Sequence, residues 1–174
     1  MVTATSISIG QIIASGAQRA LDLGELLAMD IPDSKFTCRS QQNMNHAAWV
    51  FGHLGQYPAT ILSLIGRDDL AAVHNHSTWA EWFGFGSVCV ADDARLPSGR
   101  ELVAAWSAAT RATITALQEA DDSTLLAPQT IERWKERWPV KVQGVNFLMC
   151  AHSMFHLGQL SAWRRTMGLP SAMG

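Results

Sequence analysis

Apolar residues recur along much of the chain at intervals of three and four positions, the spacing that places them on one face of an α-helix. No segment shows the pattern of a strand. The sequence predicts four helices, at about residues 9–28, 45–65, 99–120 and 142–167. Pro58 lies inside the second of these segments and is expected to kink it, because proline removes a backbone hydrogen bond.

Capping signals mark the ends of two predicted helices. Ser98 and Glu101 form an S-x-x-E capping box at the start of the third helix. Gly168 follows the fourth helix and suits a left-handed C-cap. Arg164 and Arg165 occupy the last turn of that helix, where positive charge complements the negative end of the helix dipole. We therefore expect these two arginines to act simply as cations at a helix end.

Two connections between the predicted helices are long, from Arg67 to Leu96 and from Asp121 to Lys141. Connections in helical bundles are usually about two to eight residues long, and longer ones are often lids or binding loops. A chain of 174 residues can also bury a substantial core. The sequence thus predicts a single all-α domain over residues 1–174, a four-helix bundle with two elaborated loops.

Composition narrows the class of protein. Hydrophobic residues make up 48% of the chain and charged residues 16%, which excludes an intrinsically disordered protein. The net charge of −2 argues against a protein whose main role is to bind nucleic acid. Three cysteines without a C-x-x-C pair do not resemble a disulfide framework, and no secretory signal is visible. We therefore expect a cytoplasmic protein.

Two segments contain no Asp, Glu, Lys or Arg: residues 40–66 and 142–163. Either segment is long enough to cross a membrane. Both, however, contain several His, Gln or Asn side chains, at a density that is costly inside a lipid bilayer. No membrane span is therefore expected, and both segments are predicted to be buried helices of a soluble bundle.

The strongest chemical signal lies in the fourth predicted helix, where His152 and His156 are four residues apart. This spacing stacks two imidazoles on one face, as two ligands of one metal ion require. His53, in the middle of the second predicted helix, is the candidate third ligand. His46 is the reserve candidate, although its place at the start of that helix better suits a capping or pocket-rim role.

A divalent ion held by three neutral imidazoles keeps open positions for water or substrate, as catalytic metal sites do. Zn2+ or Ni2+ is expected, because imidazole suits these borderline ions. The alternative is that the three histidines are core residues with separate hydrogen-bond partners.

The segment W-V-F-G-H-L-G at residues 49–55, followed by I-L-S-L-I-G at 61–66, resembles the second helix of the DinB/YfiT-like metalloenzyme superfamily. Residues 152–160 resemble that superfamily's last helix, with its pattern H-x3-H-x-G-Q. The similarity extends to E-W-F-G at residues 81–84 and to the start of the third predicted helix. The resemblance therefore spans most of the chain.

This resemblance implies that His53, His152 and His156 bind a metal ion inside a four-helix bundle with an unusual connection order. Gln159 matches the family's glutamine and is a candidate for a hydrogen bond to a ligand or a metal-bound water. The family pattern does not settle the roles of His46, His74 and His76. A homodimer is expected, both from the family and because the chain is rich in apolar residues that an interface would cover.

Two reactions suit such an ion, because it lowers the pKa of a bound thiol or water. The first is transfer of a low-molecular-weight thiol such as mycothiol, bacillithiol or glutathione to an electrophile, as in related members of the superfamily. The second is hydrolysis of a small-molecule amide, ester or related bond. Neither charge-free helix offers an Asp or Glu as a general base, which favours thiol transfer. Glu81 or Asp92 could still fold over the site, and a non-catalytic metal- or ligand-binding module is a third interpretation.

The stretch from Arg133 to Trp138 mixes cations with aromatic residues, a composition that is also found at nucleic-acid surfaces. Because Glu132 and Glu136 are interleaved, a loop packed over the bundle is the simpler interpretation. The functional alternative is a rim that attracts an anionic substrate.

Overall fold

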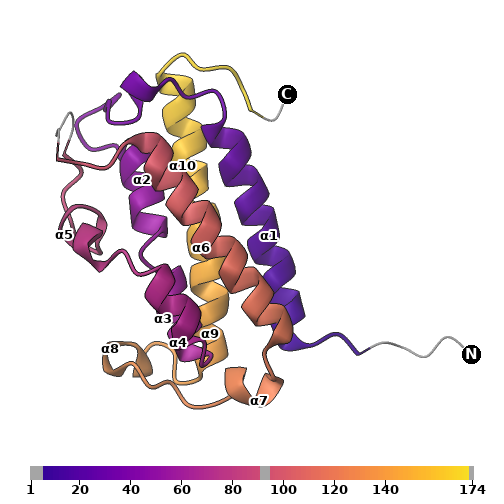
Figure 1. The fold of residues 1–174 in the computed structure, drawn as a ribbon. Coiled ribbons are helices and arrows are strands. Elements are labelled where there is room, and N and C mark those ends of the chain that lie inside the picture. The colour runs from indigo at the N-terminus through magenta and orange to yellow at the C-terminus, as the bar shows by residue number, and fades with distance from the viewer. Residues whose placement is uncertain (1–5, 91–94, 173–174) are drawn as a thin grey trace, which may run out of the picture.

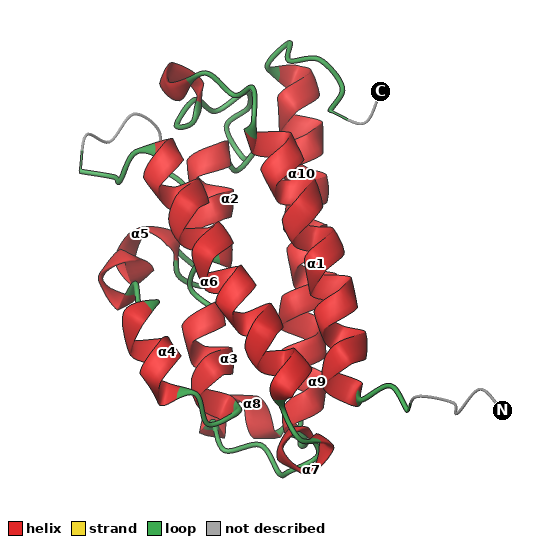
Figure 2. Cartoon of the chain, turned by 45° about the vertical axis from the view of Figure 1, so that its right-hand side comes forward, coloured by secondary structure: helices red, strands yellow, loops and turns green. Residues whose placement is uncertain are grey.

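Long helices run side by side through the protein, and short helices fill the connections between them (Figures 1 and 2). The computed structural model describes residues 6–90 and 95–172. Within these ranges all the regular elements are helices, and no strand is formed. The predicted all-α class is therefore confirmed. The longer elements are α1 (Ile9–Ala28), α2 (Ala47–Leu54), α3 (Pro58–Leu64), α6 (Gly99–Glu119), α9 (Lys141–Asn146), the π-helical turn η3 (Phe147–His152) and α10 (Ser153–Thr166).

The packing order of the helices brings the two charge-free segments together. α1 packs against α6 and α10, and α2 packs against both α6 and α10. α3 continues along α6 beyond α2. Segments about one hundred residues apart in the sequence, α2 and α10, are therefore neighbours in space.

Capping boxes close the N-termini of the two longest helices, α1 and α6. α1 begins after Ser8, whose hydroxyl accepts a hydrogen bond from the Gln11 backbone N–H, while the Gln11 side chain accepts from the Ser8 N–H. Ser98 and Glu101 form the same reciprocal pair at the start of α6. The prediction of a capping box at Ser98 is confirmed.

The second predicted helix is two helices, so the prediction of one kinked helix over residues 45–65 is wrong. α2 ends at Leu54, and α3 starts at Pro58. Proline is well tolerated in the first turn of a helix, where its missing N–H has no intrahelical partner anyway. Pro58 therefore begins a new helix, and the three residues before it form a short break beside the functional site.

The fourth predicted helix is continuous but irregular. Its middle is the π-helical turn η3, between α9 and α10. Within this region the Ser153 hydroxyl donates to the Leu148 carbonyl, five residues back. Such π turns are rare in proteins, and those that occur often lie at functional sites. This one ends at His152.

The end of α10 has the predicted C-cap. Gly168 has a φ of +70°, in the left-handed region that favours glycine. Its N–H donates to the Arg165 carbonyl, and the Leu169 N–H donates to the Arg164 carbonyl. This pair of bonds is a Schellman motif.

Arg164 is more than a cation at a helix end, and this corrects the sequence prediction. Its side chain is buried and donates to the carbonyls of Leu27 and Pro170 and to both oxygens of Asp30. The Arg164 hydrogen bond holds the pKa of the Asp30 carboxyl below its usual value. Arg164 thus joins α10 to the end of α1 and to the C-terminal segment, whereas Arg165 is exposed.

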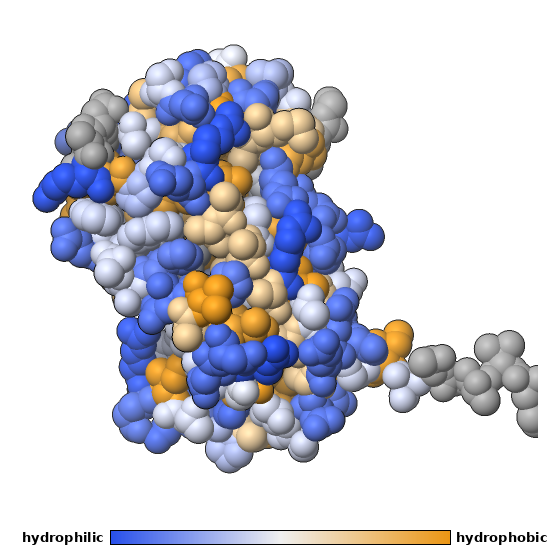
Figure 3. Space-filling view, viewed as in Figure 1, coloured by the Kyte–Doolittle hydropathy of each residue, from blue (hydrophilic) through white to orange (hydrophobic). Residues whose placement is uncertain are grey.

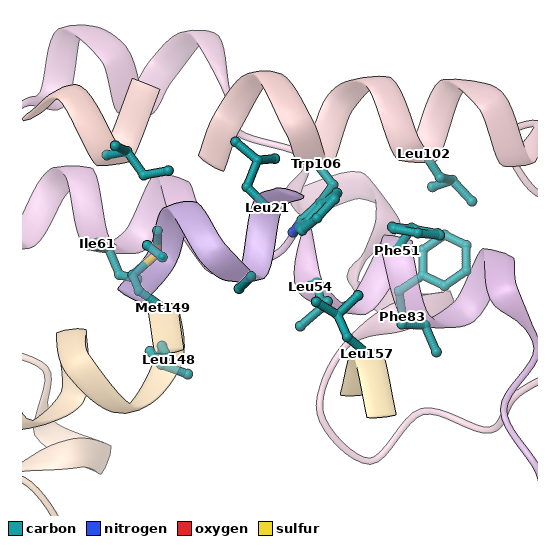
Figure 4. Packing of buried hydrophobic residues seen from close by; sticks show 14 of the residues in the cluster. Leu21, Phe51, Leu54, Ile61, Phe83, Leu102, Trp106, Leu148, Met149 and Leu157 are labelled. Atoms are coloured by element: carbon teal, nitrogen blue, oxygen red, sulfur yellow. The ribbon is translucent and has the colours of Figure 1, made fainter. Parts of the chain in front are cut away.

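The core is centred on large side chains from several helices (Figure 4). Trp106 of α6 is buried, and its ring centroid lies 5.3 Å from that of Phe51 of α2. A Cβ at Gly24 of α1 would lie 2.2 Å from the Trp106 ring, so glycine permits this close contact. Leu157 of α10 packs into the same cluster.

The two long connections predicted from the sequence contain short helices. The first holds α4 (Asp68–Val73), the 3-10 turn η2 (Ser77–Trp79) and α5 (Ala80–Phe83). The second holds α7 (Asp122–Leu125) and α8 (Glu132–Lys135), with an isolated bridge between Pro128 and Val140.

The outer surface over α6 is mostly hydrophilic, with a narrow band of mildly hydrophobic residues along its centre (Figure 3). Among the exposed α6 residues are Ala104, Ala108 and Arg111. None of the described helices combines the length and apolar character that a membrane span needs.

We predict that Arg164→Met lowers the free energy of unfolding by about 2–4 kcal/mol, because it leaves the carbonyls of Leu27 and Pro170 without their donor and removes the ion pair with Asp30. Arg165→Met removes the same charge from the exposed neighbour and should change the stability by no more than about 0.5 kcal/mol. Urea denaturation of the two variants measures both effects, and equal stabilities would contradict a structural role for Arg164.

Candidate metal centre

Three imidazoles from two distant parts of the chain meet between α2 and α10. His53 comes from α2, His152 ends η3, and His156 lies one turn into α10. The His152 Nε2 atom lies 3.2 Å from His53 Nε2 and 3.1 Å from His156 Nε2. One nitrogen from each of the three rings lies within 4.8 Å of the others. The structure thus brings together the three residues that the sequence selected.

His53 is oriented by a backbone carbonyl from the first long connection. Its Nδ1 lies 2.7 Å from the carbonyl oxygen of Phe83, the last residue of α5. A carbonyl oxygen can only accept, so Nδ1 carries the proton and the Nε2 lone pair faces the other histidines. The Trp49 ring stacks on His53 with centroids 4.5 Å apart. Together these contacts fix both the tautomer and the orientation of the ring.

Gly52 makes the contact with Phe83 possible. A Cβ at position 52 would lie 2.4 Å from Cγ of the buried Phe83 ring. The absence of a side chain therefore lets α5 approach the backbone of α2 closely enough for its last carbonyl to reach His53.

Gln159 supports His156 from the next turn of α10. The Oε1 atom of Gln159 lies 3.1 Å from His156 Nδ1 and accepts a hydrogen bond from it. This arrangement leaves the Nε2 lone pair of His156 free to face the centre of the cluster. Hydrogen bonds of this kind are typical of histidines that bind metal ions, because they set ring orientation and basicity.

His152 is held by aromatic rings instead. Its Nδ1 atom is buried and has no hydrogen-bond partner among the described residues. The ring centroid lies 4.9 Å from that of Tyr57, edge to face, and 5.8 Å from that of Phe147. Packing, together with the π turn that ends at this residue, positions His152.

All three imidazoles are held neutral at ordinary pH. Burial, followed by the neighbouring His156 and His53, lowers the pKa of His152 to about 3. Burial, followed by His53, lowers the pKa of His156 to about 4. Burial also lowers the pKa of His53 from 6.5, although its bond with Phe83 acts in the opposite direction. Neutral imidazole is the form that binds a metal ion.

The donor set fits a divalent ion. Two imidazole nitrogens bound to Zn2+ at about 2.0–2.1 Å in a tetrahedral site lie about 3.3–3.4 Å apart. The observed Nε2 separations of 3.1 and 3.2 Å are close to this value. The Nε2 atoms of His53 and His156, whose rings are oriented by their Nδ1 hydrogen bonds, both face His152 Nε2. The three histidines are thus positioned to bind a metal ion.

Comparison with models of protein families shows to which family the chain belongs. A model of the DinB superfamily matches residues 18–160, which include all three histidines and Gln159. The protein belongs to the DinB superfamily. Comparisons with curated proteins and with solved structures found no match.

His46 lies outside the cluster of this DinB-superfamily chain. It is the N-cap of α2, where its Nδ1 accepts from the Trp49 backbone N–H at 3.0 Å. Its Nε2 lies 2.8 Å from the Val90 carbonyl and donates to it. The structure therefore shows the capping role that the sequence suggested, and not a ligand of the triad.

The two loop carboxylates considered in the sequence do not join the three histidines. Glu81 lines a separate cavity of about 210 Å3, together with His46 and Arg95. Asp92 lies outside the described residues. Within the described ranges, the histidine triad is the cluster of His, Cys, Asp or Glu suited to a metal ion.

An open cleft of about 700 Å3 lies over the triad. Its walls are largely aromatic, from Trp49 of α2, Phe85 and Phe147, and Phe155 of α10. Asn45 and Ser87 supply polar groups, and no Asp or Glu is among the described residues that line it. A small molecule can therefore reach the three histidines through an apolar passage.

Tyr57 is a site residue that the sequence analysis passed over. Its hydroxyl lies 3.3 Å from His53 Nε2, and burial raises the pKa of the phenol. The available signal was its spacing of four residues from His53, which would place both on one helical face. The break before Pro58 separates Tyr57 from α2 but still leaves its hydroxyl at the centre of the cluster.

We predict that Gly52→Ala weakens metal binding about tenfold or more, because the added methyl group displaces Phe83 and loosens the carbonyl that orients His53. Gly158→Ala is the matched control: it lies in the other histidine helix, and its Cβ would meet nothing within 4 Å. Calorimetric titration of the metal-free proteins with Zn2+ measures both affinities. Equal weakening in the two variants would contradict the proposed link.

The lowered histidine pKa values predict acid sensitivity in the metal-free protein. Unfolded imidazoles bind protons near pH 6.5, whereas folded His156 and His152 do so only near pH 4 and 3. Between these values the unfolded state binds more protons, so stability should fall as the pH drops from about 6.5 to about 4.

Melting temperatures of metal-free protein across this range test the effect. In a His152→Gln/His156→Gln double variant, the melting temperature should fall less with decreasing pH than in the wild type. The control is His74→Gln, which removes a histidine outside the cluster. An unchanged slope in the double variant would disprove the assignment.

Proposed function

We propose that the protein is a metal-dependent transferase that joins a low-molecular-weight thiol to a small electrophile. The observation that carries the proposal is the convergence of three neutral imidazoles at the floor of an apolar cleft that no described carboxylate lines. His53, His152 and His156 would hold the ion, Zn2+ or Ni2+. A divalent ion in such a site lowers the pKa of a thiol or water that occupies an open position.

The residues around the triad would bind and orient the substrates. In the reaction, the thiol sulfur forms a bond to an electrophilic carbon, the leaving group departs with its bonding pair, and the thiol proton passes to solvent. Phe85, Phe147 and Phe155 would hold the apolar part of a substrate and exclude water from the reacting atoms. Asn45 offers a polar contact at the same wall.

Tyr57 would act as a hydrogen-bond donor at the reacting centre. Because burial raises the pKa of its phenol, the hydroxyl remains protonated near neutral pH. It already lies 3.3 Å from His53 Nε2, so it can donate to a substrate sulfur or oxygen placed over the triad.

The chemistry of the lining distinguishes thiol transfer from hydrolysis. Attack by water commonly uses a carboxylate to accept and return a proton, whereas a thiol gives up its proton more readily. The cleft offers aromatic rings, an amide and hydroxyls, and Glu81 lies in another cavity. This supports thiol transfer, with metal-dependent hydrolysis as the second candidate and a non-catalytic binding module as the third.

We predict that metal-loaded protein accelerates conjugation of glutathione, bacillithiol or mycothiol with monobromobimane or chlorodinitrobenzene above the rate without protein. His53→Ala should reduce this acceleration by about 100-fold or more, since it removes a ligand and its orienting contacts. His74→Ala, a histidine outside the cluster, should retain the activity. Metal content is measured for each preparation, and His152→Ala should lose the bound ion.

The other outcomes decide between the alternatives. Turnover of esters or amides without added thiol would replace the proposal with hydrolysis. Tight metal binding without either activity would favour a binding module, and metal retained in full by His152→Ala would remove the triad as the site. The homodimer and the cytoplasmic location stay predictions from the sequence.

A further inference from the structure

The cleft over the histidines continues into a second cavity toward α8. This second cavity has a volume of about 330 Å3 and shares Phe85, Phe147 and His152 with the first. Its far wall is formed by the second long connection, including Trp134 and Trp138. A molecule that reaches the triad can therefore extend along one passage to this connection.

Two arginines line the second cavity and stack on its aromatic wall. The Arg133 guanidinium lies 5.7 Å from the Trp134 ring centroid. The Arg137 guanidinium lies 5.2 Å from the Trp138 centroid and 5.3 Å from that of Phe147. A guanidinium stacked on a ring keeps its in-plane N–H donors free for an acceptor at the edge.

Neither arginine has a carboxylate partner among the described residues, in contrast to five other cations of the chain. Lys135, between them, pairs with Glu132. Arg67, Arg100, Arg111 and Arg164 also pair with carboxylates. The charges of Arg133 and Arg137 are therefore available to a ligand in the cavity.

The cationic end of the passage is close to the reacting centre. Burial raises the pKa of Tyr57, and the positive charge of Arg133 acts against this shift. Tyr57 lines the same cavity as both arginines, and its hydroxyl also faces His53. One ligand can thus contact an arginine and the triad at once.

We propose that the thiol substrate carries a carboxylate, which Arg133 and Arg137 bind while the reacting sulfur lies at the histidines. The inference rests on the proposed function, because it names the substrate class of the same site. The planar carboxylate matches the fork of guanidinium N–H groups, and each such bond is charge-assisted. Aromatic rings between the two ends hold the connecting carbon chain.

The test measures ligand binding to metal-free, full-length protein, so it does not depend on catalysis or on the ion. Calorimetry compares 4-phenylbutyrate with 4-phenylbutanamide, a neutral ligand of the same shape. We expect the carboxylate to bind at least about fivefold more tightly, as one or two charge-assisted bonds would give. Added salt should reduce the difference in affinity between the carboxylate and the amide, because exposed charges are screened.

Variants locate the effect. Arg133→Gln/Arg137→Gln should abolish the preference for the carboxylate and leave the affinity for the amide unchanged. Lys135→Gln removes one positive charge from the segment between the two arginines, outside the cavity lining, and should keep the preference. Near-ultraviolet circular dichroism checks that the neighbouring tryptophans remain packed in the double variant.

Several results would overturn the proposal: equal affinities for the two ligands, no detectable binding of either, or an equal loss of preference in Lys135→Gln. Tighter binding of 3-phenylpropyl phosphate than of 4-phenylbutyrate would replace the carboxylate with a phosphate. If the preference is found but thiol conjugation is not, the anion site stands and the transferase fails. If thiol conjugation is found but the preference for the carboxylate is not, the transferase stands and the proposed anion site is wrong.

Discussion

The hydrogen bond from His53 Nδ1 to the Phe83 carbonyl joins the first long connection to the helix that carries the site. It sets the tautomer of His53 and so directs the Nε2 lone pair toward the other histidines. It also anchors the chain two residues before Phe85, which forms a wall of the cleft. The same contact therefore supports the metal-binding face of the ring and the passage that leads to it, and both depend on Gly52 allowing the ring of Phe83 to lie against α2.

Irregular backbone surrounds this centre. The break between α2 and α3 contains Tyr57, whose hydroxyl lies 3.3 Å from His53 Nε2, and the π turn of η3 ends at His152. Regular helices would satisfy more backbone hydrogen bonds, but they position side chains only at fixed intervals. Both departures lie within one residue of a group at the centre of the cluster, which is where such features often serve function.

Charge is arranged around the cleft in a consistent way. The two segments that carry the histidines contain no Asp, Glu, Lys or Arg, so their burial lowers the histidine pKa values without an opposing carboxylate. Arg164 is buried at another place, where carbonyls and Asp30 satisfy it. The unpaired cations at the far end of the passage come instead from the second long connection.

The sequence by itself determined the all-α class and the bounds of α1 and α6. It also selected the three histidines that the structure brings together. Periodicity, capping residues and the spacing of His152 and His156 are local, so they can be read along one segment. It also pointed to the family, which the match over residues 18–160 shows. Only the tertiary structure decided which atoms orient the histidines, that Tyr57 faces His53, that Arg164 is buried, and that Arg133 and Arg137 line the second cavity. Each of these depends on contacts between residues far apart in the chain, and local spacing carries no information about such contacts.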